Sequence, residues 1–327
     1  MGRRHIQSMA QLIRRQMSSV GKTFQCQCQP YHRLLLRRHF CPSQLSAFPK
    51  KSPFRRHSLA DGTLREKILS RTKPVVGVVT GSDDCDQAEI LALLGYDFIW
   101  ADAEHSTNDA ATFEKVILAA ERRGVPTLVR IGYGYHRVIG HVQKFLGAGA
   151  QGIILPQCET ADDARMIVEA VKFPPLGRRG LAGERWNAWG LGEGGGLARR
   201  VRTSNDHSVV GIIIESLRGV DALDDILSVK GIDFVFVAPT DLSSDMGLPG
   251  QIRHLDVVAI VEEVGTRVLS AGISSGTLVL TAEDYAYWRA RGFQVMSAVA
   301  QNMFIDGAQG MMKGIVQYEK AEETSEW

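Results

Sequence analysis

The first sixty residues of this chain contain no aspartate or glutamate, although its 327 residues together carry 36 acidic side chains. Twelve of the 38 Lys and Arg residues lie in the same stretch, so the rest of the chain is acidic despite a net charge of +2. An Arg-rich, Ser-containing, acid-free segment is typical of a mitochondrial transit peptide. We therefore expect residues 1–58 to be a cleaved targeting segment for the mitochondrial matrix and residues 59–327 to form the folded body.

The basic leader allows two other interpretations. It could be a disordered arm that binds nucleic acid or anionic lipid. No aromatic-interleaved basic patch continues into the body, so we expect no nucleic-acid partner. A plastid leader has a similar composition and stays open.

Cysteine and long apolar runs are also scarce. Three of the five cysteines (Cys26, Cys28 and Cys41) lie in the leader, and Cys85 and Cys158 have no His or Cys partner at zinc spacing. This excludes a disulfide framework and a structural zinc site. No apolar run reaches the roughly 18 residues of a membrane span, so no membrane partner is expected.

The body alternates short β-branched runs with segments of helical period. The apolar runs cover residues 75–80, 98–102, 127–130, 152–155, 209–214, 234–238, 273–276 and 293–298. The helical segments cover residues 86–94, 109–123, 137–146, 161–171, 220–227, 256–271 and 282–291, and a glycine in a position to cap follows six of them. Eight strands with intervening helices predict a parallel (β/α)8 TIM barrel with a C-terminal helix; a doubly wound open sheet is the alternative.

Residues 173–205 interrupt this rhythm with a stretch rich in Gly, Arg and Trp that is too long for an ordinary connection. Residues 190–195 formally match G-x-G-x-x-G, but they follow no strand and open no clear helix, which argues against a dinucleotide site. We expect a flexible lid or a loop at a subunit contact.

Ionisable side chains follow four of the expected strands. The second run ends in Asp102 with His105 three residues on, the third ends in Arg130, and Glu215 and Asp241 follow the fifth and sixth. Barrel enzymes carry their catalytic groups at these carboxyl ends, so we expect one site here. Glu215 and Asp241 each follow an apolar run, and two oxygen ligands with waters suit Mg²⁺ or Mn²⁺. The alternative for Asp241 is to cap a following helix.

Arg130 and His105 are the expected catalytic side chains. The guanidinium of Arg130 can hold an enolate or carboxylate oxygen; its alternative is a structural ion pair with Glu104 or Glu215. A hydrogen bond from Asp102 to His105 would fix the tautomer and keep the imidazole basic.

Motifs in these runs resemble those of the HpcH/HpaI aldolase family, whose type member is 4-hydroxy-2-oxoheptanedioate aldolase. The resemblance covers about residues 64–315. Its marks are Gly95-Tyr96-Asp97-Phe98, Asp102-Ala103-Glu104-His105, Leu128-Val129-Arg130, residues 149–156 (GAQGIILP), residues 173–180 (FPPLGRRG), Ile214-Glu215 and Pro239-Thr240-Asp241-Leu242-Ser243.

The resemblance implies a barrel of the phosphoenolpyruvate/pyruvate type, a homo-oligomer (a hexamer), and a small 2-oxo acid substrate. It implies a divalent metal, Mg²⁺ first with Mn²⁺ or Co²⁺ possible, held by the residues matching Glu215 and Asp241. Backbone amides at Thr240 and Asp241, after Pro239, would hold the substrate carboxylate.

The resemblance also assigns roles to the remaining residues. His105 would act as the base with Asp102 as its neighbour, and Arg130 would stabilise the enolate. Trp100 matches an active-site Trp of macrophomate synthase, a relative, and would contact substrate.

Two positions depart from the family pattern. Gly147 stands where the family aldolases carry an Asp that raises the basicity of the catalytic His, and Ile213 replaces a Gln that contacts substrate. Both departures weaken the case for an ordinary aldol base while leaving the metal and enolate machinery intact.

The activity expected is reversible aldol cleavage of a 4-hydroxy-2-oxo acid to pyruvate and an aldehyde, a carbon–carbon lyase reaction. Oxaloacetate decarboxylation and a macrophomate-synthase-like enolate addition are alternatives, and a non-catalytic metal-binding barrel is a third. A Schiff-base aldolase is disfavoured, because Lys115, Lys144 and Lys172 fall in helical segments rather than at strand ends.

Removal of the leader is the first testable expectation. Amino-terminal sequencing of the protein purified from organelles should give a start between about residues 57 and 64, because acid-free targeting segments are cleaved after import. A mature protein that begins at Met1 would contradict this.

Overall fold

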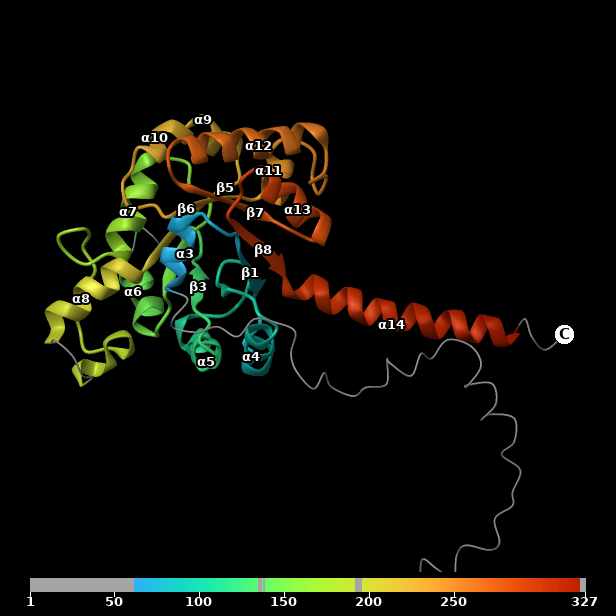
Figure 1. Ribbon diagram of the computed structural model, residues 1–327, viewed down its shortest axis with the longest axis horizontal. Coiled ribbons are helices and arrows are strands. Elements are labelled where there is room, and N and C mark those ends of the chain that lie inside the picture. Colours follow the sequence, from blue (N-terminus) through green and yellow to red (C-terminus); the bar gives the residue numbers. More distant parts are fainter. Residues whose placement is uncertain (1–61, 135–136, 138, 192–195, 324–327) are drawn as a thin grey trace, which may run out of the picture. The chain divides into compact units, whose positions relative to one another are not determined.

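The computed structural model describes residues 62–134, 137, 139–191 and 196–323, which belong to one compact unit (Figure 1). The predicted leader, residues 1–58, and residues 192–195 of the formal G-x-G-x-x-G match lie outside the described residues.

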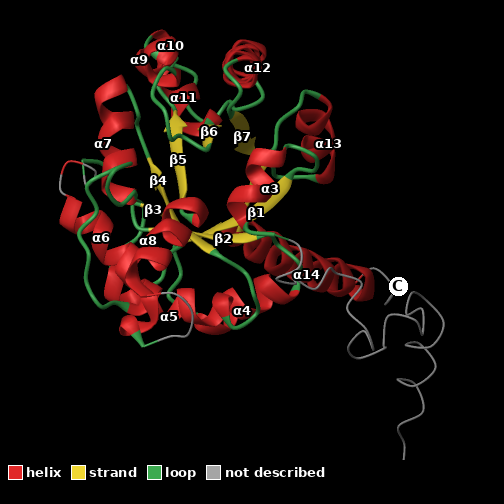
Figure 2. Ribbon diagram, turned by 60° about the vertical axis from the view of Figure 1, so that its left-hand side comes forward, coloured by secondary structure: helices red, strands yellow, loops and turns green. Residues whose placement is uncertain are grey.

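Eight parallel strands close into a barrel in sequence order, and β8 pairs with β1 (Figures 1 and 2). This confirms the predicted TIM barrel and rejects the open sheet. Five strands have the predicted bounds, and the last three shift by one or two residues. The strands are β1 (Val75–Thr80), β2 (Phe98–Asp102), β3 (Thr127–Arg130), β4 (Gly152–Leu155), β5 (Val209–Ile214), β6 (Phe234–Val237), β7 (Ser274–Leu278) and β8 (Val295–Val299).

Helices surround the strands (Figure 2). Each predicted helix is present, although residues 220–227 divide between two short helices, and a further helix follows β6. Gly95, Gly124, Gly149, Gly231, Gly272 and Gly292 all have the predicted positive φ. The outer helices are α4 (Cys85–Leu93), α5 (Ala110–Glu121), α6 (Ile139–Gly147), α7 (Ala161–Val171), α9 (Leu217–Asp221), α10 (Leu223–Leu227), α11 (Pro239–Asp245), α12 (Leu255–Ser270) and α13 (Ala282–Ala290).

Aromatic rings fill the inside of the barrel, and glycines on neighbouring strands make room for them. Phe98 and Phe234 are fully buried. A Cβ added to Gly77 would lie 2.3 Å from the ring of Phe98, and one added to Gly211 would lie 2.3 Å from the ring of Phe234. Glycine at these strand positions is therefore a packing requirement, because interiors leave no space for an extra methyl group.

A helix that the sequence analysis did not predict, α3 (Leu64–Ser70), closes the amino-terminal end of the barrel. Its buried Leu64 and Ile68 pack in the same cluster as Phe98 and Phe234. Thr63 caps this helix. The Glu66 amide donates to the Thr63 hydroxyl at 3.2 Å, and the Glu66 carboxylate accepts from the Thr63 amide.

The segment 173–205 contains two helices, the 3-10 helix η4 (Arg185–Gly190) and α8 (Gly196–His207), instead of an irregular loop. Because it connects the end of α7 to the start of β5, it lies at the amino-terminal end of its barrel. Lys172 secures it by donating to the carbonyls of Asn205 and Ser208 at 2.7 and 2.6 Å. The prediction of a lid is wrong for the expected site of the same chain, because that site was predicted at the carboxyl ends of the strands, at the opposite end of the barrel. A subunit contact stays a prediction.

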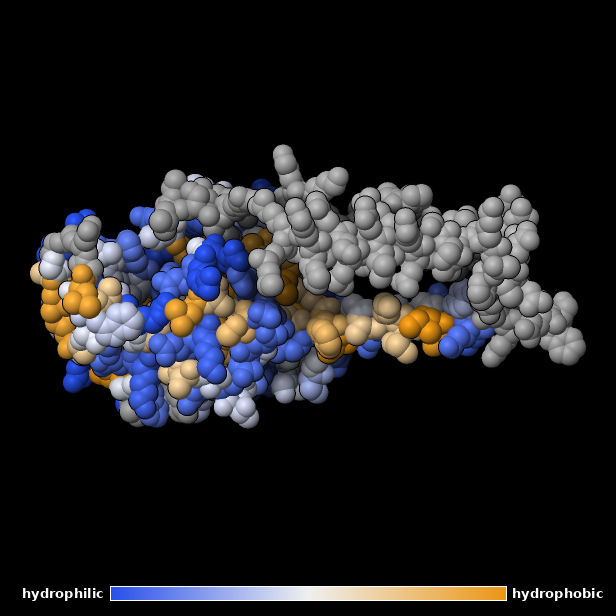
Figure 3. Space-filling model, turned by 90° about the horizontal axis from the view of Figure 1, so that it is seen from below, coloured by the Kyte–Doolittle hydropathy of each residue, from blue (hydrophilic) through white to orange (hydrophobic). Residues whose placement is uncertain are grey.

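The last helix, α14 (Ala300–Glu323), leaves the barrel after β8 (Figure 1). Every residue from 301 to 321 is exposed, and apolar surface runs along the helix (Figure 3). Its exposed large apolar side chains are Met303, Phe304, Ile305, Met311, Met312, Ile315, Val316 and Tyr318. Within the described residues, none of the helices combines the length and apolar character needed to cross a membrane.

Candidate active site

Asp102 and Arg130 form the central contact of the carboxyl-terminal rim. The two residues are register partners at the ends of β2 and β3. Arg130 Nε lies 2.8 Å from Asp102 Oδ1 and Nη2 lies 2.6 Å from Oδ2, a two-pronged pair. Burial alone would raise the pKa of Asp102, but the hydrogen bonds and charge of Arg130 outweigh it and hold the pKa below its ordinary value. The pair therefore stays ionised and fixes the guanidinium at the rim.

The expected hydrogen bond between the Asp102 carboxylate and the His105 imidazole is not among the contacts of these two described residues. Asp102 Oδ1 instead accepts the backbone amides of Glu104 and His105 at 3.1 and 3.3 Å, which shapes the turn after β2. The physical reason is competition, because both carboxylate oxygens already bind Arg130. Asp102 thus positions Arg130 and the turn.

Glu104, which the sequence analysis named only as an alternative ion-pair partner of Arg130, forms that ion pair and is also the carboxylate beside the histidine. Its Oε2 lies 3.7 Å from His105 Nε2 and 3.4 Å from Arg130 Nη1. Burial raises the pKa of Glu104, with Arg130 and His105 opposing the rise. The His105 side chain is 61% exposed, so a substrate can reach it.

Glu215 is a buried carboxylate that follows β5. Its Oε1 accepts the backbone amide of Gln157 at 2.7 Å, and Gln157 has a left-handed backbone with φ of 47°. Burial, together with the charges of Asp241 and Glu104, raises the pKa of Glu215 to about 7. The left-handed backbone of its amide donor and the negative charges around it mark Glu215 as a candidate functional residue.

Pro239, Thr240 and Asp241 begin α11, with Pro239 in the first turn and Asp241 as its acidic residue. Thr240 and Asp241 are exposed, and their backbone amides belong to the unsatisfied first turn of the helix. Asp241 is not the N-cap, since Ala238 occupies that position without a side-chain cap. Its carboxylate acts electrostatically on both Glu215 and Glu104 and raises the pKa of each, and its role as a metal ligand stays a prediction.

Trp100 and Ile213 lie beneath this rim, inside the barrel. Trp100 is 1% exposed and meets the ring of Phe236 edge-on, with centroids 4.9 Å apart. Its buried Nε1 has no hydrogen-bond partner in the part of the chain that the structure describes. Trp100 therefore forms the floor of the site, and its substrate contact stays a prediction.

Gly147 lies far from this rim, as the last residue of α6 at the amino-terminal end of the barrel. A Cβ added there would lie 3.1 Å from the carboxylate carbon of Glu184, a residue of the segment before β5. A side chain at position 147 would therefore stand at the opposite end from His105 of its own chain. The inference that Gly147 weakens its own His105 is not supported by this geometry.

The carboxylates of the rim fit a divalent cation. Asp102, Glu104, Glu215 and Asp241 oppose one arginine, and among the described residues the buried Glu215 has a backbone amide as its hydrogen-bond partner and no ion pair. Within the described ranges, no group of three or more His, Cys, Asp and Glu side chains is arranged to hold a metal, so a cation here would use few protein ligands. Mg²⁺ is commonly held by one or two carboxylates together with waters and substrate oxygens.

The lysines considered for a Schiff base lie away from the rim. Lys115 and Lys144 are on the outer helices α5 and α6, and Lys172 is the C-cap of α7, at the amino-terminal end of the barrel. Burial lowers the pKa of Lys172 to about 8, but its ammonium group donates to two backbone carbonyls.

Ionisable side chains stand at the carboxyl ends of β2, β3 and β5, which is where barrel enzymes carry their catalytic groups. The model of the HpcH/HpaI aldolase/citrate lyase family matches residues 76–305. The chain belongs to this family of carbon–carbon lyases.

Named relatives and solved structures agree with this membership. A hydroxypyruvate/pyruvate aldolase of Roseovarius nubinhibens is 33% identical over 219 residues, which cover 66% of this chain and 83% of the relative. A 2-keto-3-deoxy-L-rhamnonate aldolase of Shigella dysenteriae is 33% identical over 217 residues, 66% of this chain and 78% of that protein. The crystal structure of an HpcH/HpaI aldolase from Desulfitobacterium hafniense has a TM-score of 0.71 at 29% identity and covers 78% of this chain and 97% of its own.

Macrophomate synthase also shares the fold. Its TM-score is 0.68 at 22% identity, with 86% of this chain and 99% of that chain covered. At this identity the likeness concerns the fold alone.

Proposed function

We propose that this protein is a divalent-metal-dependent aldolase that cleaves a 4-hydroxy-2-oxo acid to pyruvate and an aldehyde, reversibly, through a pyruvate enolate. The observation that carries the proposal is the rim itself: a fixed guanidinium, an accessible imidazole and a buried carboxylate around one space. The names of the aldolase relatives support it. We also propose, on the composition of residues 1–58, that the protein acts in the mitochondrial matrix.

The metal would be held by Glu215 and Asp241, with Mg²⁺ the first candidate and Mn²⁺ or Co²⁺ also suitable. When bound it would polarise the 2-oxo group of the substrate. The amides at Thr240 and Asp241 would receive the substrate carboxylate, and Trp100 would bound the pocket below. Arg130 would stabilise the oxygen that becomes negative as the bond breaks, because Asp102 holds its guanidinium in place beforehand.

His105 would take the proton of the C4 hydroxyl as the C3–C4 bond breaks. Glu104, 3.7 Å from Nε2, would stabilise the positive charge that the ring then carries. This assigns to Glu104 the electrostatic role that the sequence analysis gave to Asp102.

Metal dependence through Glu215 and Asp241 is the second prediction. Chelation should abolish activity and added Mg²⁺, Mn²⁺ or Co²⁺ should restore it, and Asp241→Asn should lose Mn²⁺ binding in a calorimetric titration. Asp225→Asn, at an exposed residue of α10, is the matched control and should bind Mn²⁺ as the wild type does. Full activity in chelator, with borohydride trapping of pyruvate on a lysine, would overturn the proposal.

Oxaloacetate decarboxylation is the second candidate function, because it would use the same metal and Arg130 without any base. Asp102 holds the Arg130 guanidinium in place, and this guanidinium would stabilise the enolate of the decarboxylation as well, which favours this candidate. Macrophomate-synthase-like addition of the resulting enolate is a further variant that rests on shared fold and on Trp100. A non-catalytic barrel is disfavoured by the accessible His105 beside Glu104.

The effect of His105→Ala separates the two chemistries, and this is the third prediction. Aldol cleavage should fall by about 10²–10⁴-fold, the usual contribution of a general base, whereas loss of CO₂ from oxaloacetate should change little. Arg130→Ala should damage both activities, since both pass through the enolate. Steady-state assays of both substrates on one Mg²⁺-loaded preparation measure this. An equal loss of both activities in His105→Ala would instead assign His105 to substrate binding.

We further propose that the protein is a homo-oligomer, a hexamer by family resemblance, in which α14 packs against a second copy of the chain. A helix with eight exposed large apolar side chains is more apolar than a free surface tolerates. The helix α4 also exposes Ile90, Leu93 and Leu94, a surface of matching character.

Charge on α14 should break this assembly, which is the fourth prediction. Phe304 is 75% exposed, so Phe304→Glu removes little burial within the chain. The barrel should therefore stay folded while the molar mass measured by light scattering falls. Leu255→Glu on α12, at a side chain 83% exposed, is the matched control and should leave the mass unchanged. A wild type that is monomeric, or a Phe304→Glu variant of unchanged mass, would contradict the role of α14.

A further inference from the structure

The carboxyl-terminal rim has a second, uncharged half. The ionisable groups of the proposed site follow β2, β3, β5 and β6, whereas the last inward-facing residues of β7, β8 and β1 are Leu278, Val299 and Val79. These three strands are neighbours, because β8 pairs with β7 and with β1. The three side chains, which we call the aliphatic wall, therefore lie on adjacent strands at the mouth of the barrel.

The strand register fixes the direction in which the aliphatic wall points. Val79 and Leu278 pack against the cluster of buried side chains inside the barrel. Val299 is the register partner of Val79 and follows Val295 of the same cluster by four residues, so strand alternation turns it inward as well. All three wall residues are half-buried, whereas Val295 below them is fully buried. Part of the apolar surface of the wall is therefore open at the rim.

The turn that carries His105 adjoins the β1 end of this wall. Asn108 Nδ2, in that turn, donates to the carbonyl of Gly81, the residue after β1, at 2.7 Å. A Cβ added to Gly81 would lie 3.2 Å from the Cβ of Ser106. Glycine at position 81 therefore lets the two segments meet. A substrate whose C4 hydroxyl reaches His105 has the aliphatic wall beside it on the β1 side.

The segments that follow the three strands provide no cation. Residues 81–84, 279–281 and 300–302 all belong to the described part of the chain and contain no Lys, Arg or His. Their charged residues are Asp83 and Asp84, which would repel an anion. A negative group on the substrate would therefore be destabilised over this half of the rim.

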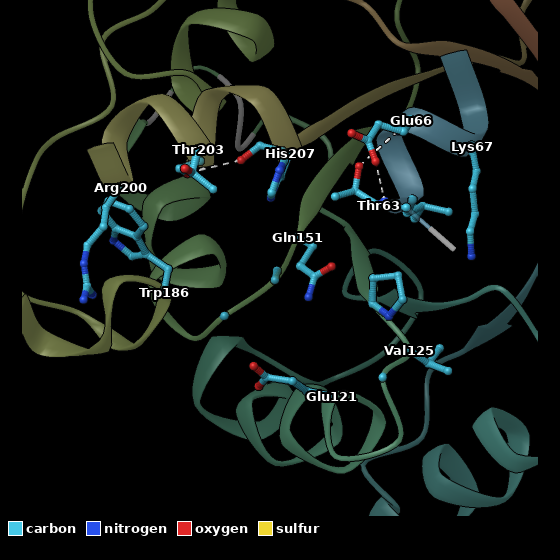
Figure 4. A pocket seen from close by; sticks show the side chains of 18 of the residues that line it. Thr63, Glu66, Lys67, Glu121, Val125, Gln151, Trp186, Arg200, Thr203 and His207 are labelled. Carbon is cyan, nitrogen blue, oxygen red and sulfur yellow. Dashed lines mark hydrogen bonds between the residues drawn. The ribbon is translucent and has the colours of Figure 1, made fainter. Parts of the chain in front are cut away.

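Cations at two other places do not serve this half of the rim. Arg253 Nη2 binds both carboxylate oxygens of Asp284 at 3.0 and 3.2 Å, and Asp284 also accepts the Leu280 amide after β7. The basic residues of the segment before β5 lie at the amino-terminal end of the barrel, where Arg200 and Lys67 line a cavity of about 760 Å³ (Figure 4). From these residues the aliphatic wall of the same chain gains no cation that could compensate a bound anion.

We propose that the aliphatic wall binds the part of the substrate beyond C4, and that the aldehyde product is an uncharged one with an aliphatic chain. The inference rests on the proposed aldolase function, because that function places C4 at His105. The chain beyond C4 would leave His105 toward β1 and lie over Val79, Val299 and Leu278. Each methylene buried there should favour binding about fourfold. A terminal carboxylate would lose water without gaining a cation.

Calorimetric titration of the full-length, Mg²⁺-loaded protein tests the wall with pyruvate, 2-oxoheptanoate and 2-oxoheptanedioate, which have no C4 hydroxyl and so cannot be cleaved. The two longer acids differ only at the last carbon, a methyl group in one and a carboxylate in the other. We expect 2-oxoheptanoate to bind at least about tenfold more tightly than 2-oxoheptanedioate. Equal or tighter binding of the dicarboxylate would overturn the inference alone. No saturable binding of any of the three acids would overturn the proposed function, and the inference with it.

Variants of Leu278 localise this preference. Leu278→Arg adds a cation to the wall, so it should weaken 2-oxoheptanoate, strengthen 2-oxoheptanedioate and reverse the ratio of their dissociation constants. Leu69→Arg, the same change at a 44% exposed residue of α3 at the opposite end of the barrel, is the matched control and should leave the ratio unchanged. If Leu278→Arg does not fold, Leu278→Ala should lower the advantage of 2-oxoheptanoate over pyruvate several-fold, because less apolar surface is buried. Wild-type ratios after these changes at position 278 would contradict the role of the wall.

The aldol addition of pyruvate to two aldehydes tests the same preference during turnover. Butanal and succinate semialdehyde have the same number of carbons and differ only in a terminal methyl or carboxylate group. In each addition the C3–C4 bond forms and one proton passes from the pyruvate methyl group to the aldehyde oxygen, so no further reactant is needed. We expect kcat/KM for butanal to exceed that for succinate semialdehyde by at least about tenfold. A preference for succinate semialdehyde would overturn the inference and leave the aldolase function standing, whereas addition to neither aldehyde would overturn both.

Discussion

The closure of β8 onto β1 is the constraint on which the rest of this structure depends. A closed parallel barrel sends every carboxyl end to one rim and every amino end to the other. Asp102 and Glu215 lie more than 100 residues apart in sequence, yet closure places them, together with Arg130, around one opening. The same closure requires Gly77 and Gly211, because Phe98 and Phe234 fill the space inside.

Electrostatic interactions then determine which of the side chains at this rim form ion pairs. Arg130 can compensate only part of the negative charge at the rim, and it binds Asp102 first, because the two are register partners at the ends of adjacent strands. Glu104 lies 3.4 Å from the remaining guanidinium nitrogen, and Glu215 forms no ion pair with any of the described residues. An uncompensated buried carboxylate beside two others is the condition under which a divalent ion stabilises a site. These pairings explain why the same rim holds a fixed guanidinium and also a space suited to a divalent cation.

Much of this could be predicted from the sequence, because strands buried on both faces give continuous apolar runs with sharp ends. The bounds of β1 to β5 and the positions of His105, Arg130 and Glu215 followed from those runs. Pairings between side chains did not follow, because they depend on register. The sequence spacing of Asp102 and His105 suggested a hydrogen bond, whereas the register of β2 with β3 gave the carboxylate to Arg130. The sequence indicated Glu104 only as an alternative ion-pair partner of Arg130, because its place beside His105 depends on the turn that Asp102 holds.

The two ends of the barrel are chemically opposed, and the segment before β5 explains how. Insertions between α7 and β5 can only extend the amino-terminal end, so Arg179, Trp186 and Arg200 lie there and not over the carboxyl-terminal rim. That end is consequently basic, while the carboxyl end concentrates carboxylates. The strand β5 spans both, from Val209 beside the cavity-lining Ser208 to Ile214 before Glu215. A rigid strand of six residues, buried throughout, links the two environments directly. The strand therefore connects α8, at the amino-terminal end, to Glu215 at the carboxyl-terminal rim.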